Sequence, residues 1–177
     1  MLRFNFFCIF ASRFSMRKRF NNFSISLDKC LVCSLEFLPV YEFEAVFCPD
    51  IDEAGRMRDY LIEYNKDLVK KDSRYIMRIT GEDYQEKKQL DNFIDPYSPY
   101  PVVVTTSELL STGVDCKTCA LIVIDKEIES MTQFKQIIGR GTRIYEYDEL
   151  DQSKNKYFFD ILDFRGATDL FRDPVFD

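Results

Sequence analysis

The chain has 177 residues, enough for one globular domain with a real core. Its 24 Lys and Arg against 30 Asp and Glu give a net charge of −6, which argues against a dominant basic groove for nucleic acid. Histidine is absent, which excludes Ser-His and Cys-His nucleophilic sites and removes the commonest transition-metal ligand. The charge is uneven, because residues 1–40 carry six Lys and Arg and two Asp and Glu, a balance of +4 that leaves −10 for the remainder.

Residues 1–42 are rich in Phe and contain the basic run Arg17–Arg19. In a signal peptide the basic residues precede the apolar stretch, whereas this basic run follows the short apolar stretch Phe4–Ala11. No run of about 18 apolar residues exists, which excludes a transmembrane helix and a membrane partner. We expect residues 1–42 to be a poorly ordered, non-native leader, derived from an upstream start or a frameshift.

From Phe43 onward, short apolar runs alternate with amphipathic stretches, and Asp50 with Glu53 has the spacing of a capping box. Unbroken runs rich in β-branched residues are typical of strands that are covered on both faces. The sequence therefore predicts an α/β domain over residues 43–177, with a doubly wound, mostly parallel sheet. In chain order we expect strand Glu44–Cys48, a helix from Ile51 to about Asn65, strand Tyr75–Ile79, a helix from about Tyr84 to Ile94, strand Val102–Val104, strand Leu121–Ile124, a helix at Gln133–Arg143 and strand Tyr157–Leu162.

The stretch QFKQIIGRGTR combines a helical face with two glycines and two arginines. On a helix, Gln136, Arg140 and Arg143 fall at i, i+4 and i+7 and would project from one side. Gly139 and Gly141 remove bulk beside the arginines, which lets a ligand come close. Guanidinium groups on such a face can bind phosphate oxygens through two parallel hydrogen bonds. The alternative is a solvated helix end with ordinary surface arginines.

Ligands of doubly wound sheets bind beyond the carboxyl ends of the strands. We expect Thr80-Gly81, Thr105-Thr106 and the loop Gly113–Asp115 to lie at those ends, on one rim with the two arginines. Simpler interpretations stay open: the paired threonines are also good strand formers, Asp115 also suits a turn cap, and Gly113 also suits a turn. Asp125 and Asp163 follow apolar strands, and we assign them to caps.

Two stretches carry a resemblance to known proteins. VVVTTSELLSTGVD, at Val102–Asp115, and the pattern Q-x-x-G-R-x-x-R, met from Gln136 to Arg143, resemble motifs V and VI of superfamily-two helicases. The segments ITGED, QLDNFIDP, MTQFKQIIGRGTR and ILDFRGATDLF look like the motor subunit of type I restriction enzymes. The resemblance covers residues 45–177 and implies the second RecA-like lobe of a double-stranded DNA translocase.

The resemblance also implies residue roles. Arg143 would be the arginine finger, and Arg140 would contact the γ-phosphate of ATP beside it. An arginine finger raises the rate of phosphoryl transfer on the order of 10³-fold. The remaining implied contacts are Gln136, Gly139, Gly113 and Asp115 for ATP, and Thr80, Gly81, Thr105 and Thr106 for the phosphates of DNA.

The sequence holds no G-x-x-x-x-G-K-[ST] motif, no D-E-x-H box and no recognisable nuclease constellation. We therefore expect half of an ATP·Mg²⁺ site, inactive alone and binding no metal by itself. The family implies a first RecA-like lobe, a nuclease domain, modification and specificity subunits, and a cytoplasmic location. A lobe built to face a partner should also be marginally soluble or self-associate.

Alternatives to this reading are a catalytically inert remnant and the equivalent lobe of another superfamily-two helicase. A dinucleotide-binding domain of an oxidoreductase is disfavoured, because no G-x-G-x-x-G follows a strand. Of the six cysteines, Cys30 with Cys33 and Cys116 with Cys119 have zinc-like local spacing. The two pairs lie too far apart for a zinc ribbon, so we expect reduced thiols.

Overall fold

The computed structural model describes residues 43–80, 84–107, 114–146 and 155–170. Every described residue lies in one compact unit, Pro39–Asp177. The predicted leader and two of the predicted site residues, Gly81 and Gly113, lie outside the described residues. In the described part of the chain, no helix is both long and apolar enough to cross a membrane.

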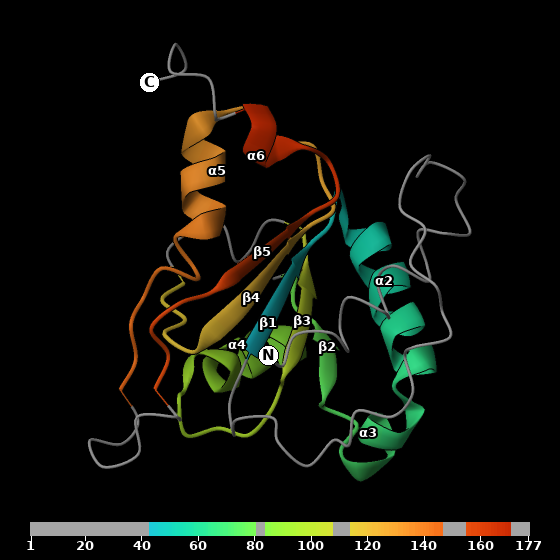
Figure 1. Ribbon diagram of the computed structural model, residues 1–177. Helices are drawn as coiled ribbons and strands as arrows, with labels where there is room; N and C mark the ends of the chain where they lie inside the picture. Colours follow the sequence, from blue (N-terminus) through green and yellow to red (C-terminus); the bar gives the residue numbers. More distant parts are fainter. Residues whose placement is uncertain (1–42, 81–83, 108–113, 147–154, 171–177) are drawn as a thin grey trace, which may run out of the picture. The chain divides into compact units, whose positions relative to one another are not determined.

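Five parallel strands form one sheet in the order β2-β3-β1-β4-β5 (Figure 1). The chain runs outward from the central strand β1 to β2, returns through β3, and crosses β1 to reach β4 and β5. This arrangement confirms the predicted doubly wound, parallel α/β fold and is consistent with a RecA-like lobe. The strands are β1 (Phe43–Phe47), β2 (Ile76–Arg78), β3 (Val103–Thr106), β4 (Cys119–Ile124) and β5 (Asp160–Asp163).

Helices α2 to α5 lie between these strands in sequence and α6 follows β5, and the sequence pattern did not indicate the two short helices α3 and α6. Their bounds are α2 (Ile51–Tyr64), α3 (Lys66–Lys71), α4 (Tyr84–Ile94), α5 (Met131–Ile138) and α6 (Ala167–Leu170).

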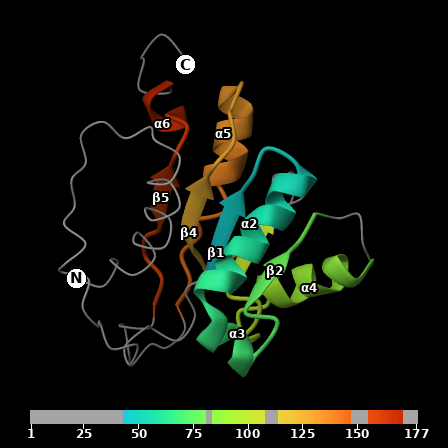
Figure 2. The same ribbon diagram turned by 90° about the vertical axis from the view of Figure 1, so that its right-hand side faces the viewer.

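Helix α2 covers one face of the sheet, in front of β1 and β2 in Figure 2. It begins where predicted, because the side chain of Asp50 accepts a hydrogen bond of 2.7 Å from the backbone N–H of Glu53. Its buried residues Ala54, Met57 and Leu61 form an apolar stripe with helical spacing. This stripe attaches the helix to the β2–β3 half of the sheet.

Helices α4 and α5 pack on the opposite face, where the main apolar core lies. In β1, Phe43, Ala45 and Phe47 alternate toward this core, as expected for a strand covered on both sides. Phe93 from α4 and Ile137 from α5 are each only 1% exposed against them. Burial of this kind contributes about 25 cal/mol per Å² of apolar surface, and it fixes where each helix ends relative to the sheet.

Two sides of the sheet matter for function. We call the side where the parallel strands end the carboxyl edge and the side where they begin the amino edge. The strand β3 continues two residues beyond its predicted end, through Thr105 and Thr106. Both threonines therefore lie inside the strand and are fully buried.

Candidate functional site

The stretch that carries the two arginines leaves the helix earlier than the sequence indicated. Helix α5 ends at Ile138, and a turn follows at Gly139. The backbone N–H groups of Arg140 and Gly141 donate to carbonyls three residues back, at Ile137 and Ile138, rather than continuing the α-helical ladder. The prediction that Gln136, Arg140 and Arg143 share one helical face is therefore wrong. We call Gly139–Arg143 the arginine loop.

A close contact explains part of this turn. A Cβ atom on Gly141 would lie 2.2 Å from Cδ2 and 2.5 Å from Cγ of Phe159. Only glycine fits over this aromatic ring, so the arginine loop can pass directly across the residue that precedes β5. Gly141 thus serves a contact within the lobe.

Arg140 joins the end of α5 to the segment that leads into β4. Its Nε donates to the carbonyl oxygen of Gln136 at 3.1 Å, and its Nη1 donates to the carbonyl oxygen of Val114. Burial lowers the pKa of the Arg140 guanidinium, and Arg143 lowers it further, while Asp115 raises it. An arginine guanidinium titrates far above neutral pH, so the group stays charged there.

Arg143 stands in a different environment. Its Nε lies 3.1 Å from Oδ1 of Asp115, and the two side chains are 62% and 49% exposed. The resemblance implied a contact from Asp115 to ATP, and in the structure this carboxylate pairs with Arg143. An ion pair this exposed contributes about 0–1 kcal/mol, so Arg143 can exchange the carboxylate for another anion at little cost.

Lys156, from the segment before β5, completes the arrangement. Its Nζ donates to the carbonyl oxygen of Gly141 at 2.7 Å and to the carbonyl oxygen of Arg143. The backbones of Lys156 and Tyr145 form an antiparallel bridge with hydrogen bonds of 3.0 and 2.8 Å. The arginine loop is therefore held by an ammonium group as well as by packing.

These contacts place the arginine loop toward the amino edge. Asp115 lies shortly before β4 begins, and Lys156 and Phe159 lie shortly before β5 begins. The threonines lie at the other side of the sheet, at the ends of β2 and β3. The prediction that arginines and threonines share one rim is wrong, because α5 carries the chain back from the carboxyl edge before the arginines occur (Figure 1).

The donors of Thr80, at the carboxyl edge, are engaged within the lobe. Its backbone N–H and its hydroxyl both donate to Oε2 of Glu86, at 3.0 and 2.8 Å. The other oxygen of that carboxylate, Oε1, accepts from Nε of Arg78 at 2.8 Å. Glu86 is 9% exposed, so these bonds lie in a largely dry environment where they are strong. In this arrangement Thr80 has neither donor free for a DNA phosphate.

Thr105 and Thr106 are both 0% exposed. The hydroxyl of Thr105 donates to the carbonyl oxygen of Ala54 at 2.9 Å, which ties β3 to α2. The hydroxyl oxygen of Thr106 has no hydrogen-bond partner among the described residues. The predicted DNA contacts therefore gain no support from these two positions.

Comparison with known proteins bears on this arrangement. No family model matches the sequence. The chain is 58% identical over 132 residues to the endonuclease subunit of the type I restriction enzyme EcoAI from Escherichia coli, a match that covers 75% of this chain and 16% of that protein. It is 31% identical over 71 residues to the EcoKI endonuclease subunit from Escherichia coli strain K12, covering 39% of this chain and 6% of that protein.

Among solved structures, a fragment assigned to the HsdR subunit of a type I restriction enzyme from Vibrio vulnificus YJ016 matches with a TM-score of 0.68 and 41% sequence identity. That match covers 77% of this chain and 26% of the other. The chain belongs to the type I restriction endonuclease-subunit family. It spans about one sixth of the EcoAI relative's length.

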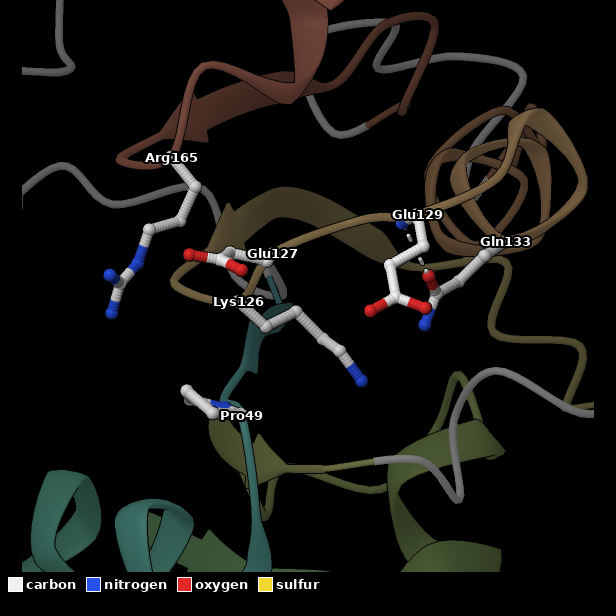
Figure 3. Close-up of a pocket in the computed structure, with 6 residues that line it drawn as sticks. All are labelled: Pro49, Lys126, Glu127, Glu129, Gln133 and Arg165. Atoms are coloured by element: carbon white, nitrogen blue, oxygen red, sulfur yellow. Dashed lines mark hydrogen bonds between the residues drawn. The ribbon is translucent and has the colours of Figure 1, made fainter.

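A further polar feature of this endonuclease-subunit segment is an open hollow of about 400 Å³ at the carboxyl edge (Figure 3). Arg165 lies on one side of it, and Glu129 and Gln133, near the start of α5, lie on the other. Its two cations are engaged: Arg165 pairs with Asp125, and Nζ of Lys126 donates to the carbonyl oxygen of Ser107 at 3.2 Å. Within the described residues, no group of three or more acidic or cysteine side chains is arranged to hold a metal.

The cysteine pair of the described segment is packed inside the lobe. Cys116 and Cys119 are 2% and 0% exposed, and burial raises the pKa of both thiols. They are uncharged at neutral pH and behave as small apolar residues.

Proposed function

We propose that this segment is the second lobe of an ATP-dependent DNA-translocating motor and that it supplies the arginine half of an ATP site. The observation that carries this proposal is the state of Arg143. Its guanidinium is exposed and weakly paired, while its backbone is tied to the sheet through Lys156. A cation that is fixed in place and easily released from its partner suits charge that develops during phosphoryl transfer.

The other residues of the loop have supporting roles in this proposal. Arg143 would exchange Asp115 for phosphate oxygens of ATP, and Arg140 would act beside it while holding the end of α5 on the Val114 carbonyl. Gln136, which is exposed at the end of α5, would contact the nucleotide, and Gly139 would let it approach. The triphosphate-binding motif and the Mg²⁺ carboxylates would come from a first lobe.

The proposal also includes contacts to DNA. The net charge of −6 does not favour binding by bulk electrostatics, so a contact would have to be local. Thr80 could offer its N–H and hydroxyl to a phosphate only if Glu86 released them.

The experiment mixes the chain with a separately produced first lobe from the same family and measures ATP hydrolysis with and without duplex DNA. We expect hydrolysis in the mixture and a loss of about 10³-fold in the Arg143→Ala variant, because the loss of an arginine finger has this size. Arg56→Ala is the matched control, since Arg56 is also exposed, at 57%, and pairs with Glu53 at 2.8 Å.

Full activity in Arg143→Ala would contradict the finger role. Absence of hydrolysis in every mixture, with both proteins folded, would favour the inert remnant. The modification and specificity subunits are proposed partners of the same assembly, and co-purification of the chain with them would test that part separately.

A further inference from the structure

The backbone of Arg143 depends on a residue that is distant in sequence. The arginine loop follows α5 and belongs to no strand or helix. Two of its carbonyl oxygens, those of Gly141 and Arg143, converge on the single ammonium group of Lys156. A lysine ammonium has three donors, so one side chain can hold both carbonyls. These two hydrogen bonds join the arginine loop to the segment before β5.

Lys156 is itself held in place. Its backbone N–H and carbonyl both bond to the backbone of Tyr145, just beyond the arginine loop. Phe159, which lies under Gly141, follows in the same segment and leads directly into β5. The backbone that carries the ammonium is therefore held by the bridge to Tyr145 and lies close to the start of β5.

The environment of the ammonium strengthens the hold. Lys156 is partly buried, and desolvation lowers its pKa, an effect that the thiols of Cys119 and Cys116 oppose. Hydrogen bonds from a charged donor are stronger than those between neutral groups, and more so away from bulk water. Within the described residues no carboxylate pairs with this ammonium, so its charge acts on the loop carbonyls.

We propose that Lys156 is a positioning residue for Arg143: by holding the carbonyls of Gly141 and Arg143, it fixes where the guanidinium stands without touching a substrate. The functional half of this inference rests on the proposed role of Arg143, whereas the mechanical half does not. Removal of the ammonium should release the arginine loop and leave the sheet, α2 and the chemistry of the guanidinium intact.

Amide hydrogen exchange on the full chain tests the mechanical half. In Lys156→Met the apolar stem is kept and the donors are lost, so the bonded amides of Arg140, Gly141 and Tyr145 should exchange about tenfold faster. Amides in β1 and β3 should keep their rates. Lys156→Arg keeps the charge and donors and should restore most of the protection, and Lys70→Met, at a lysine whose side chain is 78% exposed, is the matched control.

Unchanged exchange in the arginine loop of Lys156→Met would overturn the proposal. Faster exchange throughout the sheet would also overturn it, because Lys156 would then support the whole lobe and not the loop.

ATP hydrolysis with a first lobe tests the functional half. Lys156→Met should lower kcat by about 10- to 100-fold with little change in KM, since displacement of a catalytic group by about 1 Å has this effect. In the Arg143→Ala background, Lys156→Met should cause less than about a twofold further loss, because both changes remove the same contribution. Additive losses, or a normal kcat in Lys156→Met when Arg143→Ala is inactive, would overturn it.

The two measurements separate the proposals. Faster exchange confined to the loop, together with no hydrolysis in any mixture, would leave Lys156 as the clamp of the loop and would refute the proposed motor function alone.

Discussion

At the carboxyl edge, Thr80 gives both of its donors to Glu86 at the start of α4, and Asp163 accepts four hydrogen bonds from its own loop. At the amino edge, Arg143 meets Asp115 in a pair that is more than half exposed on the arginine side. The polar groups of the first edge are used to hold the lobe together. At the second edge, Lys156 holds the backbone carbonyl of Arg143, and the side chain of Arg143 remains largely exposed.

This difference shows that polar residues at strand ends are not a sufficient sign of a binding rim. A group can serve a ligand only if its donors are free or weakly bound, since breaking a buried hydrogen bond costs about 1–3 kcal/mol. By that criterion the amino edge is the better candidate. Substitutions at each edge test this difference.

The largest expected effect on stability comes from Glu86→Ala at the carboxyl edge. The change leaves Arg78 and Thr80 without their carboxylate, and breaking a buried pair costs about 3 kcal/mol. Urea denaturation would measure this loss. Asp67→Ala is the control, because its pair with Lys70 is exposed and should be worth less than about 0.5 kcal/mol.

The same variant also tests whether the carboxyl edge can bind phosphate once Glu86 is removed. If Glu86→Ala binds duplex DNA more tightly than the unchanged chain, and Thr80→Val cancels the gain, the carboxyl edge is a phosphate site that Glu86 keeps covered. If only the stability falls, the donors of Thr80 are structural.

The sequence predicted some elements of the fold more closely than others. Apolar runs predicted all five strands, and Asp50 with Glu53 predicted the start of α2 to the residue. Strand ends were less certain. The strand predicted at Tyr157–Leu162 lies at Asp160–Asp163, because Lys156 enters a bridge with Tyr145 that periodicity does not reveal. Apolar spacing reports burial, and burial determines the fold.

The site was less predictable, for two physical reasons. Asp115 lies in the connection from β3 to β4, close to the start of β4. The path of this connection, which the sequence does not show, decides at which edge of the sheet Asp115 lies. The partners of Thr80 and Arg143 are side chains that become neighbours only after folding, Glu86 and Asp115 respectively. No sequence pattern indicated a role for Lys156, since a lysine before an apolar run is common.

The second expected effect comes from Gly141→Ala at the amino edge. The added Cβ would overlap the ring of Phe159, and overpacking of this kind costs about 2 kcal/mol. The displaced ring should also move the arginine loop. Thermal denaturation would measure the loss. Gly55→Ala is the control, because its Cβ would meet only Arg78 at an ordinary 3.5 Å, and alanine within a helix should add about 0.5–1 kcal/mol. A Gly141→Ala variant as stable as the unchanged chain would show that the contact with Phe159 does not shape the loop.

The smallest effect compares one aspartate from each edge, Asp163 and Asp115. Oδ1 of Asp163 accepts from the backbone N–H groups of Arg165 and Gly166, both at 3.0 Å, and Oδ2 accepts from the N–H and the hydroxyl of Thr168. Burial raises the pKa of this carboxyl, but the hydrogen bonds outweigh burial and bring the pKa below its ordinary value of 3.8.

A carboxyl whose pKa is lower in the folded chain stabilises the fold at pH values above its unfolded pKa, and this contribution is lost as the pH falls through the folded pKa. Asp163→Asn should therefore cost about 1 kcal/mol at pH 7, and the difference from the unchanged chain should persist down to about pH 4 and shrink below it. Urea denaturation between pH 7 and pH 3 would measure this. Asp115→Asn removes only an exposed pair and should cost less than about 0.5 kcal/mol at pH 7. If Asp115→Asn proved as costly as Asp163→Asn, the amino-edge pair would be part of the lobe's own framework, and Arg143 would not be available to a phosphate.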